Sequence, residues 1–259
     1  MSASTFRSTS PVDDAAVAAA GILTDHWRAG TRIAALPGAV RPQTREEGYK
    51  VQALFERESR HPLFGWKIAA TSEAGQRHIA VSGPLAGRLL RERVIRPGGT
   101  VALGTNQMRV AEMEFAFRMG ARLAAREAPY TVEEVLDAIE TLHPSIEIPD
   151  SRFENFEQAG EAQLVADNAC AHFFVCGDAT DFGWRDVDLS AHIVVGQIND
   201  GPEKIGIGSN VLGDPRLAMC WIANELSMLG IGLEPGQVVT TGACVPPMAI
   251  AAEIGRAHV

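Results

Sequence analysis

Val110-Ala-Glu-Met-Glu-Phe-Ala-Phe-Arg-Met119 is the stretch of the sequence that says most about the fold. Alternate residues of a β-strand face opposite sides of a sheet. One side of this segment would then be entirely apolar and would face the core, through Ala111, Met113, Phe115, Phe117 and Met119. Glu112 and Glu114 share the other side, with Cα atoms about 6.5–7 Å apart. The segment therefore predicts a long strand with one apolar face and one acidic face.

The two glutamates on one strand face allow two interpretations. Neighbouring carboxylates repel each other unless a positive charge lies between them. Spacing alone favours a solvated face of an edge strand, and Glu147 taken singly is also expected to face solvent. However, Glu147 lies in a short strand expected at 145–148, between two isoleucines that would point to the core. Three carboxylates match the oxygen ligands of Mg²⁺ or Mn²⁺ and leave about three octahedral positions for substrate and water.

Helices are expected on both sides of this strand in the sequence. The expected helices are Asp13–Arg28, Thr44–Ser59, a segment from Thr131 to the His143-Pro144 pair, and Pro215–Gly230. Two of them begin with a capping box, formed by Thr44 with Glu47 and by Thr131 with Glu134. The spacing of apolar residues after Thr131 fits a helix as far as Leu142.

Short apolar runs, separated by glycine and proline, dominate the second two-thirds of the chain. Strands are expected at 64–69, 171–176, 192–198 and 237–241. Because these strands do not alternate regularly with helices, an α+β fold is favoured, with a folded-over β core and helices packed around it. We expect an N-terminal helical segment over 1–62 and a β-rich catalytic domain over 63–259, joined as one structural unit.

Composition excludes several classes of protein. The 259 residues are 46% hydrophobic and 21% charged, which is typical of a globular protein with a sizeable core. A net charge of -9 argues against nucleic-acid binding, since phosphate recognition needs a basic surface. No apolar stretch reaches the 18 or so residues of a membrane span, and the polar start of the chain lacks the apolar core of a signal peptide. The four scattered cysteines predict buried thiols in a reducing cytoplasm.

Six short motifs together resemble one known family. In chain order they are Gly65-Trp-Lys67, Glu112-x-Glu114, Pro144-Ser-Ile-Glu-Ile-Pro-Asp-Ser-Arg152, Val165-Ala-Asp-Asn-Ala169, Leu212-Gly-Asp-Pro215 and Val239-Thr-Thr-Gly242. This order is similar to that of the fumarylacetoacetate hydrolase superfamily, and within it to the 2-hydroxypenta-2,4-dienoate hydratase and 4-oxalocrotonate decarboxylase branch. Each motif alone has little specificity, but the resemblance extends over roughly residues 45 to 250.

The resemblance implies a mixed β-roll fold and a Mg²⁺ or Mn²⁺ site. The acidic metal ligands of the family fall on Glu112, Glu114 and Glu147, the trio that the strand pattern also selects. The family lysine falls on Lys67, between Trp66 and Ile68, where a buried lysine needs a partner. We expect Lys67 to face the bound substrate, a small anionic 2-oxo or 2-hydroxy acid. The relatives also suggest a homo-oligomer.

Five further residues match family positions. The resemblance implies a catalytic role for Asp167 and substrate-binding roles for Arg152, Asn168, Thr241 and Gly242. Asp167, Asn168 and Arg152 also fit a structural role, as an Asx turn or an ion pair near the acidic site. Both alternatives remain open on the sequence alone.

Three activities are compatible with such a site. A hydratase that adds water to a 2-hydroxy-2,4-dienoate is favoured, and a decarboxylase of 2-oxo-3-hexenedioate (4-oxalocrotonate) is the alternative. A carbon–carbon hydrolase would need a His/Glu pair to activate water, for which only Glu73 and His78 are plausibly placed, and both fit surface positions better. A non-catalytic subunit that pairs with an enzyme is the rival of a different class.

The sequence departs from the family pattern in three places. Ser82 stands before the Gly83-Pro84 turn, where relatives often carry an acid, and Asp214 replaces a common histidine and fits a helix N-cap. The chain is also short after Ala252, so that a closing strand would lack its partner. We therefore expect residues 245–259 to be poorly ordered or packed against another subunit.

Overall fold

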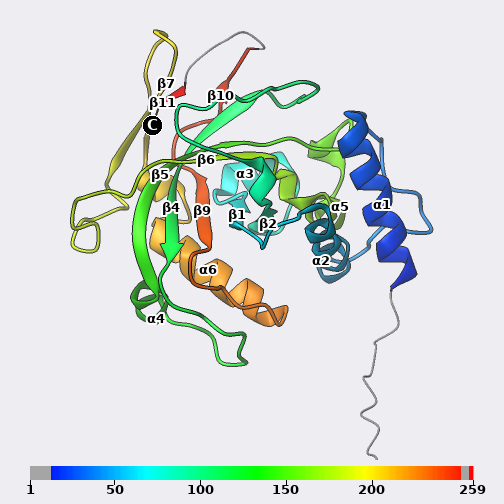
Figure 1. Ribbon diagram of the computed structural model, residues 1–259, viewed down its shortest axis with the longest axis horizontal. Coiled ribbons are helices and arrows are strands. Elements are labelled where there is room, and N and C mark those ends of the chain that lie inside the picture. Colours follow the sequence, from blue (N-terminus) through cyan, green and yellow to red (C-terminus); the bar gives the residue numbers. More distant parts are fainter. Residues whose placement is uncertain (1–12, 252–256, 259) are drawn as a thin grey trace, which may run out of the picture.

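A curled mixed sheet forms the centre of the protein in the computed structural model, which describes residues 13–251 and 257–258 (Figure 1). Its strands lie in the order β2 (Leu85–Leu89), β1 (Gly65–Ala69), β9 (Val238–Ala243), β4 (Val110–Met119), β5 (Ile139–Ile148), β6 (Phe173–Cys176) and β3 (Val94–Ile95). A short strand, β10 (Met248–Ala249), also pairs with β4. The β1–β9 and β3–β6 pairs are parallel, while the remaining pairs are antiparallel. The expected α+β roll is confirmed.

β4 lies in the middle of this sheet, between β9 and β5. It has the bounds that the alternating pattern predicts. Its odd-numbered residues all lie in the main apolar core: Ala111, Met113, Phe115, Phe117 and Met119. The edge-strand alternative is therefore wrong, because both sides of β4 are paired and its acidic face is turned into the roll.

Helices cover the sheet. The α-helices are α1 (Asp14–Ala29), α2 (Arg45–Ala53), α3 (Glu73–His78), α4 (Val132–Asp137), α5 (Glu161–Ala166) and α6 (Pro215–Met228). Short 3₁₀ turns are η1 (Leu54–Glu58), η2 (Arg91–Arg93), η3 (Phe156–Gln158), η4 (Asn168–Cys170) and η5 (Gly208–Asn210). In Figure 1, α1 and α2 lie at one side of the molecule and β7 at the other. No helix in the described part of the chain is long and apolar enough to span a membrane.

The predicted helix ends are confirmed where capping chemistry sets them. Thr44 and Glu47 form the expected capping box at the start of α2, and Thr131 with Glu134 does the same for α4. α1 ends at Gly30, which has a left-handed backbone with φ of 65°. Asp214 accepts a hydrogen bond from the backbone N–H of Arg216, so it is the N-cap expected for α6.

The helix predicted from Thr131 to His143-Pro144 is wrong in its second half. α4 ends at Asp137, and the chain enters β5 at Ile139. The pairing of β5 with β4 skips Glu140, so this residue forms a β-bulge. A bulge shifts the alternation of inward and outward side chains by one residue. Ile139 and Leu142 are therefore buried on the same face of the strand, although they are three residues apart, a spacing that also fits a helix.

The expectation that a closing strand would lack a partner is also wrong for the described residues. Ala257 and His258 form β11, which pairs within the chain with β7 (Ile193–Ile198). β7 also pairs with β8 (Lys204–Ile207), a strand that the sequence patterns did not predict. Residues 252–256 and 259 lie outside the described residues. An edge strand offers unpaired N–H and C=O groups, and β7 supplies such an edge.

Candidate active site

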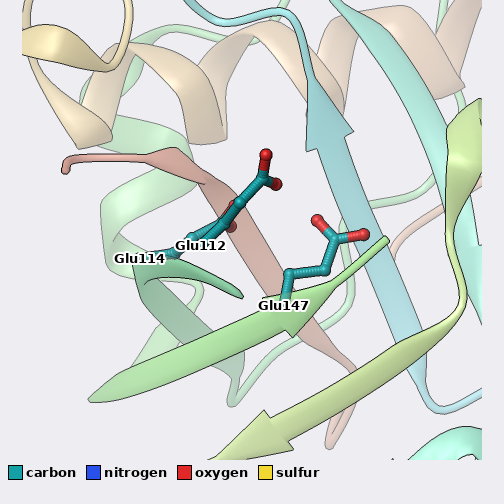
Figure 2. A group of neighbouring side chains, drawn as sticks. All are labelled: Glu112, Glu114 and Glu147. Carbon is teal, nitrogen blue, oxygen red and sulfur yellow. The ribbon is translucent and has the colours of Figure 1, made fainter. Parts of the chain in front are cut away.

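Glu112, Glu114 and Glu147 converge on one point of the inner face of the sheet. β4 and β5 pair so that Glu112 lies opposite Glu147 and Glu114 lies opposite Ser145. One carboxylate oxygen from each of the three glutamates lies within 4.8 Å of the others. Figure 2 shows the three side chains leaving β4 and β5 toward the same space. The structure thus brings together the three residues that the strand pattern selected.

These carboxylates are withdrawn from water. Glu114 is 2% exposed and Glu147 is 0% exposed, while Glu112 is half-buried. Burial raises the pKa of all three carboxyl groups, and for Glu147 to about 7. Glu114 Oε1 and Glu147 Oε2 are buried without a hydrogen-bond donor. A buried carboxylate oxygen without a partner is costly, and a divalent cation would satisfy both oxygens at once, so the donor set fits Mg²⁺ or Mn²⁺.

Glu114 is held by β9 through one of its two oxygens. The Thr240 hydroxyl and the Gly242 backbone N–H, the latter at 2.8 Å, both donate to Glu114 Oε2. Oε1 is left free to bind a ligand. Thr240 was missed from the sequence, although alternation in the 237–241 strand places it on the face opposite Thr241. The Thr241 hydroxyl instead donates to the carbonyl of Phe115 at 3.0 Å.

Gly242 is required by close packing as well as by this hydrogen bond. Its φ is 105°, a conformation that favours glycine. A Cβ atom at this position would lie 2.1 Å from the Thr71 hydroxyl oxygen. The carboxylate that the Gly242 backbone N–H reaches in this structure is that of Glu114.

Lys67 is the cationic group of the cluster. Its side chain is 3% exposed, and its Nζ lies 3.1 Å from Glu147 Oε1. Nζ also donates a hydrogen bond to the backbone carbonyl of Ala169 at 3.0 Å. Burial alone would lower the pKa of Lys67, but the carboxylates of Glu147 and Glu112 outweigh it and raise the pKa above its usual value. Lys67 is therefore a buried ammonium that faces the candidate metal ligands.

The carbonyl that holds Lys67 belongs to a strained turn. Asn168, Ala169 and Cys170 have consecutive φ values of 57°, 49° and 60°, in the left-handed region. Non-glycine residues in this region cost about 1–3 kcal/mol each and concentrate at functional sites. The Asn168 side chain fixes the turn to β2, because its Oδ1 accepts from the Arg88 N–H at 2.6 Å and its Nδ2 donates to the Arg88 carbonyl at 2.9 Å.

Proteins similar to this chain extend over almost its whole length. A search against profiles of known protein families finds no match. The 2-keto-4-pentenoate hydratase 1 of Dechloromonas aromatica (strain RCB) is 33% identical over 237 residues, covering 90% of this chain and 88% of the relative. The chain belongs to the hydratase and decarboxylase branch of the fumarylacetoacetate hydrolase superfamily.

Two further relatives of this branch agree. The 2-hydroxyhexa-2,4-dienoate hydratase of Comamonas testosteroni is 35% identical over 194 residues, or 73% of this chain and 71% of the relative. Among solved structures, 4-oxalocrotonate decarboxylase from Pseudomonas putida G7, complexed with magnesium and adipate, has a TM-score of 0.82 and 25% identity. The match covers 94% of this chain and 92% of that protein. Both chemistries of the branch are therefore represented among the relatives.

In this member of the superfamily, Arg152 and Asp167 bind each other. The Arg152 guanidinium donates to the carboxylate and to the carbonyl of Asp167, and it lies 4.8 Å from the ring of Trp27. Asp167 also accepts from the Ser151 hydroxyl at 2.7 Å and from the Arg152 N–H at 2.9 Å. Since both side chains are buried and engaged by the protein, the structural alternative fits this pair better than direct contact with substrate.

The remaining departures from the superfamily pattern are local. The Ser82 hydroxyl donates to Glu161 at 2.9 Å, so a carboxylate from α5 lies beside the loop where relatives often carry an acid. His78 lies 3.3 Å from Glu157 and is more than half exposed, as is Glu73. The His78 and Glu73 side chains thus lie at the surface, as expected.

Proposed function

We propose that this chain is a metal-dependent hydro-lyase that adds water to a 2-hydroxy-2,4-dienoate and produces a 4-hydroxy-2-oxo acid. The observation that carries the proposal is the group of three carboxylates beside a buried lysine, two of which, Glu114 and Glu147, are buried with unsatisfied oxygens. The names of the relatives, a 2-keto-4-pentenoate hydratase and a 2-hydroxyhexa-2,4-dienoate hydratase, support this substrate class.

Glu112, Glu114 and Glu147 would hold Mg²⁺ or Mn²⁺. When bound, the cation supplies a Lewis acid that favours negative charge on the carboxylate and C2 oxygen of a 2-oxo acid. Thr240 and the Gly242 N–H orient Glu114 so that its free oxygen faces the site. The burial of the carboxylates excludes bulk water, which strengthens each charge interaction.

Lys67 would balance the charge of the occupied site. Three carboxylates exceed the charge of a divalent cation by one, and the substrate is itself an anion. The Lys67 ammonium can donate a hydrogen bond to the substrate carboxylate or to the C2 oxygen, where negative charge develops. In the proposed reaction the C2 hydroxyl of the dienol first loses its proton while C5 takes one, which gives a 2-oxo-3-enoate whose C4 is electrophilic. The oxygen of water then forms a bond to C4, water gives up one proton, and C3 takes a proton.

Decarboxylation of 2-oxo-3-hexenedioate is the second candidate activity. It is favoured by the structural similarity to 4-oxalocrotonate decarboxylase, in which the match covers 94% of this chain. Stabilisation of negative charge on the C2 oxygen assists loss of CO₂ as well as addition of water. The three carboxylates and Lys67 serve both reactions equally, so they do not discriminate between them.

Product analysis with both substrates tests the proposal. Purified protein is freed of metal with EDTA, supplied with Mg²⁺ or Mn²⁺, and given 2-hydroxypenta-2,4-dienoate or 2-oxo-3-hexenedioate. We expect metal-dependent formation of 4-hydroxy-2-oxopentanoate from the first substrate. Release of CO₂ from the second substrate alone would identify a decarboxylase. The absence of turnover of both substrates by the purified protein would favour a non-catalytic subunit.

A further inference from the structure

A cavity of about 440 Å³ is lined in part by Arg118, near the end of β4. Its lining includes Phe64, Arg91, Arg96, Arg118, His143 and Asp178. None of the residues assigned to the metal or to the substrate above belongs to this lining. A volume of this size is within the range of small-molecule sites.

The cavity and the carboxylates share the inner face of β4 but are well separated. Glu114 and Arg118 are four residues apart on this strand, which corresponds to about 13 Å. Ala116 lies between them and belongs to a buried apolar cluster with Phe64, Leu89, Phe174 and Val238. Since Glu112, Glu114 and Glu147 do not line the cavity, a ligand in it would be held by other residues.

The cavity concentrates unpaired positive charge on an acidic protein. Arg91, Arg96 and Arg118 all line it, and within the described residues none of them has a carboxylate within 4.0 Å. Arginines elsewhere are commonly paired, as Arg28, Arg45, Arg88, Arg122 and Arg126 are. Asp178 is the one carboxylate of the described lining, and it is exposed. Because the chain has a net charge of -9, a general excess of positive charge does not explain three guanidinium groups without a carboxylate partner at one cavity.

Two of the three arginines are held in place. The Arg91 guanidinium lies 5.1 Å from the centre of the Phe64 ring, in a cation–π contact. Arg118 projects from the central strand, and its Nη1 donates to the carbonyl of Gly236 at 3.2 Å. The floor is provided by His143, which is buried and bonded to Thr141 and to the Gly177 carbonyl. Burial lowers the pKa of His143, so the floor is polar and neutral at pH 7.

We propose that this cavity binds a small polyanion through phosphate or carboxylate groups. Guanidinium groups match both anions with paired, charge-assisted hydrogen bonds, and several of them around one volume favour a ligand with more than one negative charge. The ligand is either a phosphorylated compound or inorganic phosphate, or a small dicarboxylate. The site is independent of the proposed hydratase activity.

Isothermal titration calorimetry at low ionic strength tests this site, with inorganic phosphate and succinate as separate probes. The protein is freed of metal, which excludes binding of the probes through Mg²⁺. We expect saturable binding of at least one probe. The double variant R91M/R96M should weaken that binding at least tenfold, since the ligand loses the charge-assisted hydrogen bonds of both arginines. Both side chains are exposed, so the fold should be retained, which circular dichroism checks. Arg57→Met, at an exposed position on η1, removes one positive charge elsewhere and should leave the affinity unchanged.

The two probes also distinguish the ligand sources. Tighter binding of phosphate indicates a phosphorylated ligand, and tighter binding of succinate indicates a dicarboxylate; both results support the site. Binding that R91M/R96M leaves unchanged would overturn the proposal. The absence of saturable binding of both probes would also overturn it. So would a double variant that changes only the oligomeric state, because these arginines would then contact a second copy of the chain.

Discussion

Glu112 on β4 lies directly opposite Glu147 on β5, so two carboxylates occupy a cross-strand pair inside the roll. Like charges in directly opposed positions destabilise a sheet. The negative charge of Glu147 is compensated by Lys67, whose Nζ is 3.1 Å from Glu147 Oε1. The remaining negative charge, including that of Glu114, has no protein cation among the described residues that contacts it. This arrangement is consistent with a site built around a divalent cation.

Replacing Glu147 by glutamine should remove most of the metal affinity. The change keeps the size of the side chain but removes one of three anionic ligands. We expect the dissociation constant for Mn²⁺ to increase by more than the 10–100-fold that is typical when a group supporting a metal ligand is lost. Titration followed by electron paramagnetic resonance measures it. Glu140→Gln, an exposed residue of the same strand, is the matched control and should bind Mn²⁺ normally.

The metal-free protein should lose stability as the pH rises. Burial raises the pKa of Glu147 to about 7 from an ordinary value of 4.5, so the folded state binds more protons than the unfolded state between these values. The free energy of unfolding contributed by this group therefore decreases from about pH 4.5 to about pH 7. Urea unfolding in EDTA at pH 5.5 and pH 8 measures the change, and Mg²⁺ at pH 8 should reverse it.

The Glu147→Gln variant is the control for this pH dependence. It lacks the titrating group and should show a smaller decrease between the two pH values. An equal decrease in both proteins would mean that other groups cause the effect.

Thr240→Val should weaken metal binding although Thr240 is not a metal ligand. The substitution keeps the shape of the side chain but removes the hydroxyl that holds Glu114 Oε2. Loss of such a supporting bond typically costs 10–100-fold in metal affinity or activity. Thr241→Val provides a close comparison, because its hydroxyl donates to the Phe115 carbonyl instead. That variant should lose about 1 kcal/mol of stability and retain its metal affinity. Equal metal affinities for the two variants would contradict the role assigned to Thr240.

Gly87→Ala should disturb the environment of Lys67. A Cβ atom at Gly87 would lie 2.5 Å from the Asn168 carbonyl oxygen and 3.0 Å from Cγ of Lys67. We expect a loss of about 1–3 kcal/mol in the free energy of unfolding, as for other overpacked sites, together with lower turnover. Gly83→Ala has nothing within 4 Å of the added Cβ and should change neither quantity. Thermal unfolding and steady-state kinetics of the two variants decide the point.

The sequence was informative where one local rule determines the structure. Alternation of apolar and acidic residues predicted β4 and the shared side of Glu112 and Glu114, and capping chemistry predicted the starts of α2 and α4. The third acid, Glu147, required the register between β4 and β5. That register follows from sheet pairing over a sequence separation of 35 residues, which periodicity alone does not show.

Other features depend on tertiary contacts. The bulge at Glu140 gave Ile139 and Leu142 the spacing of a helix, although both residues lie in β5. The burial of the acidic face follows from curling of the sheet, which turns Glu114 away from solvent. Thr240 is recognisable only once β9 is placed beside β4, because its partner Glu114 is distant in sequence.

The central claim is that a cation on the three glutamates acts together with Lys67 on an anionic substrate. The most direct measurement compares wild-type and Lys67→Met protein for both Mn²⁺ affinity and turnover of 2-hydroxypenta-2,4-dienoate. Methionine keeps the apolar stem and removes the charge. The account predicts that Mn²⁺ still binds while kcat falls by roughly 10²-fold or more, the scale of one lost hydrogen-bond donor to a developing oxyanion. Turnover by Lys67→Met at nearly the wild-type rate would contradict it.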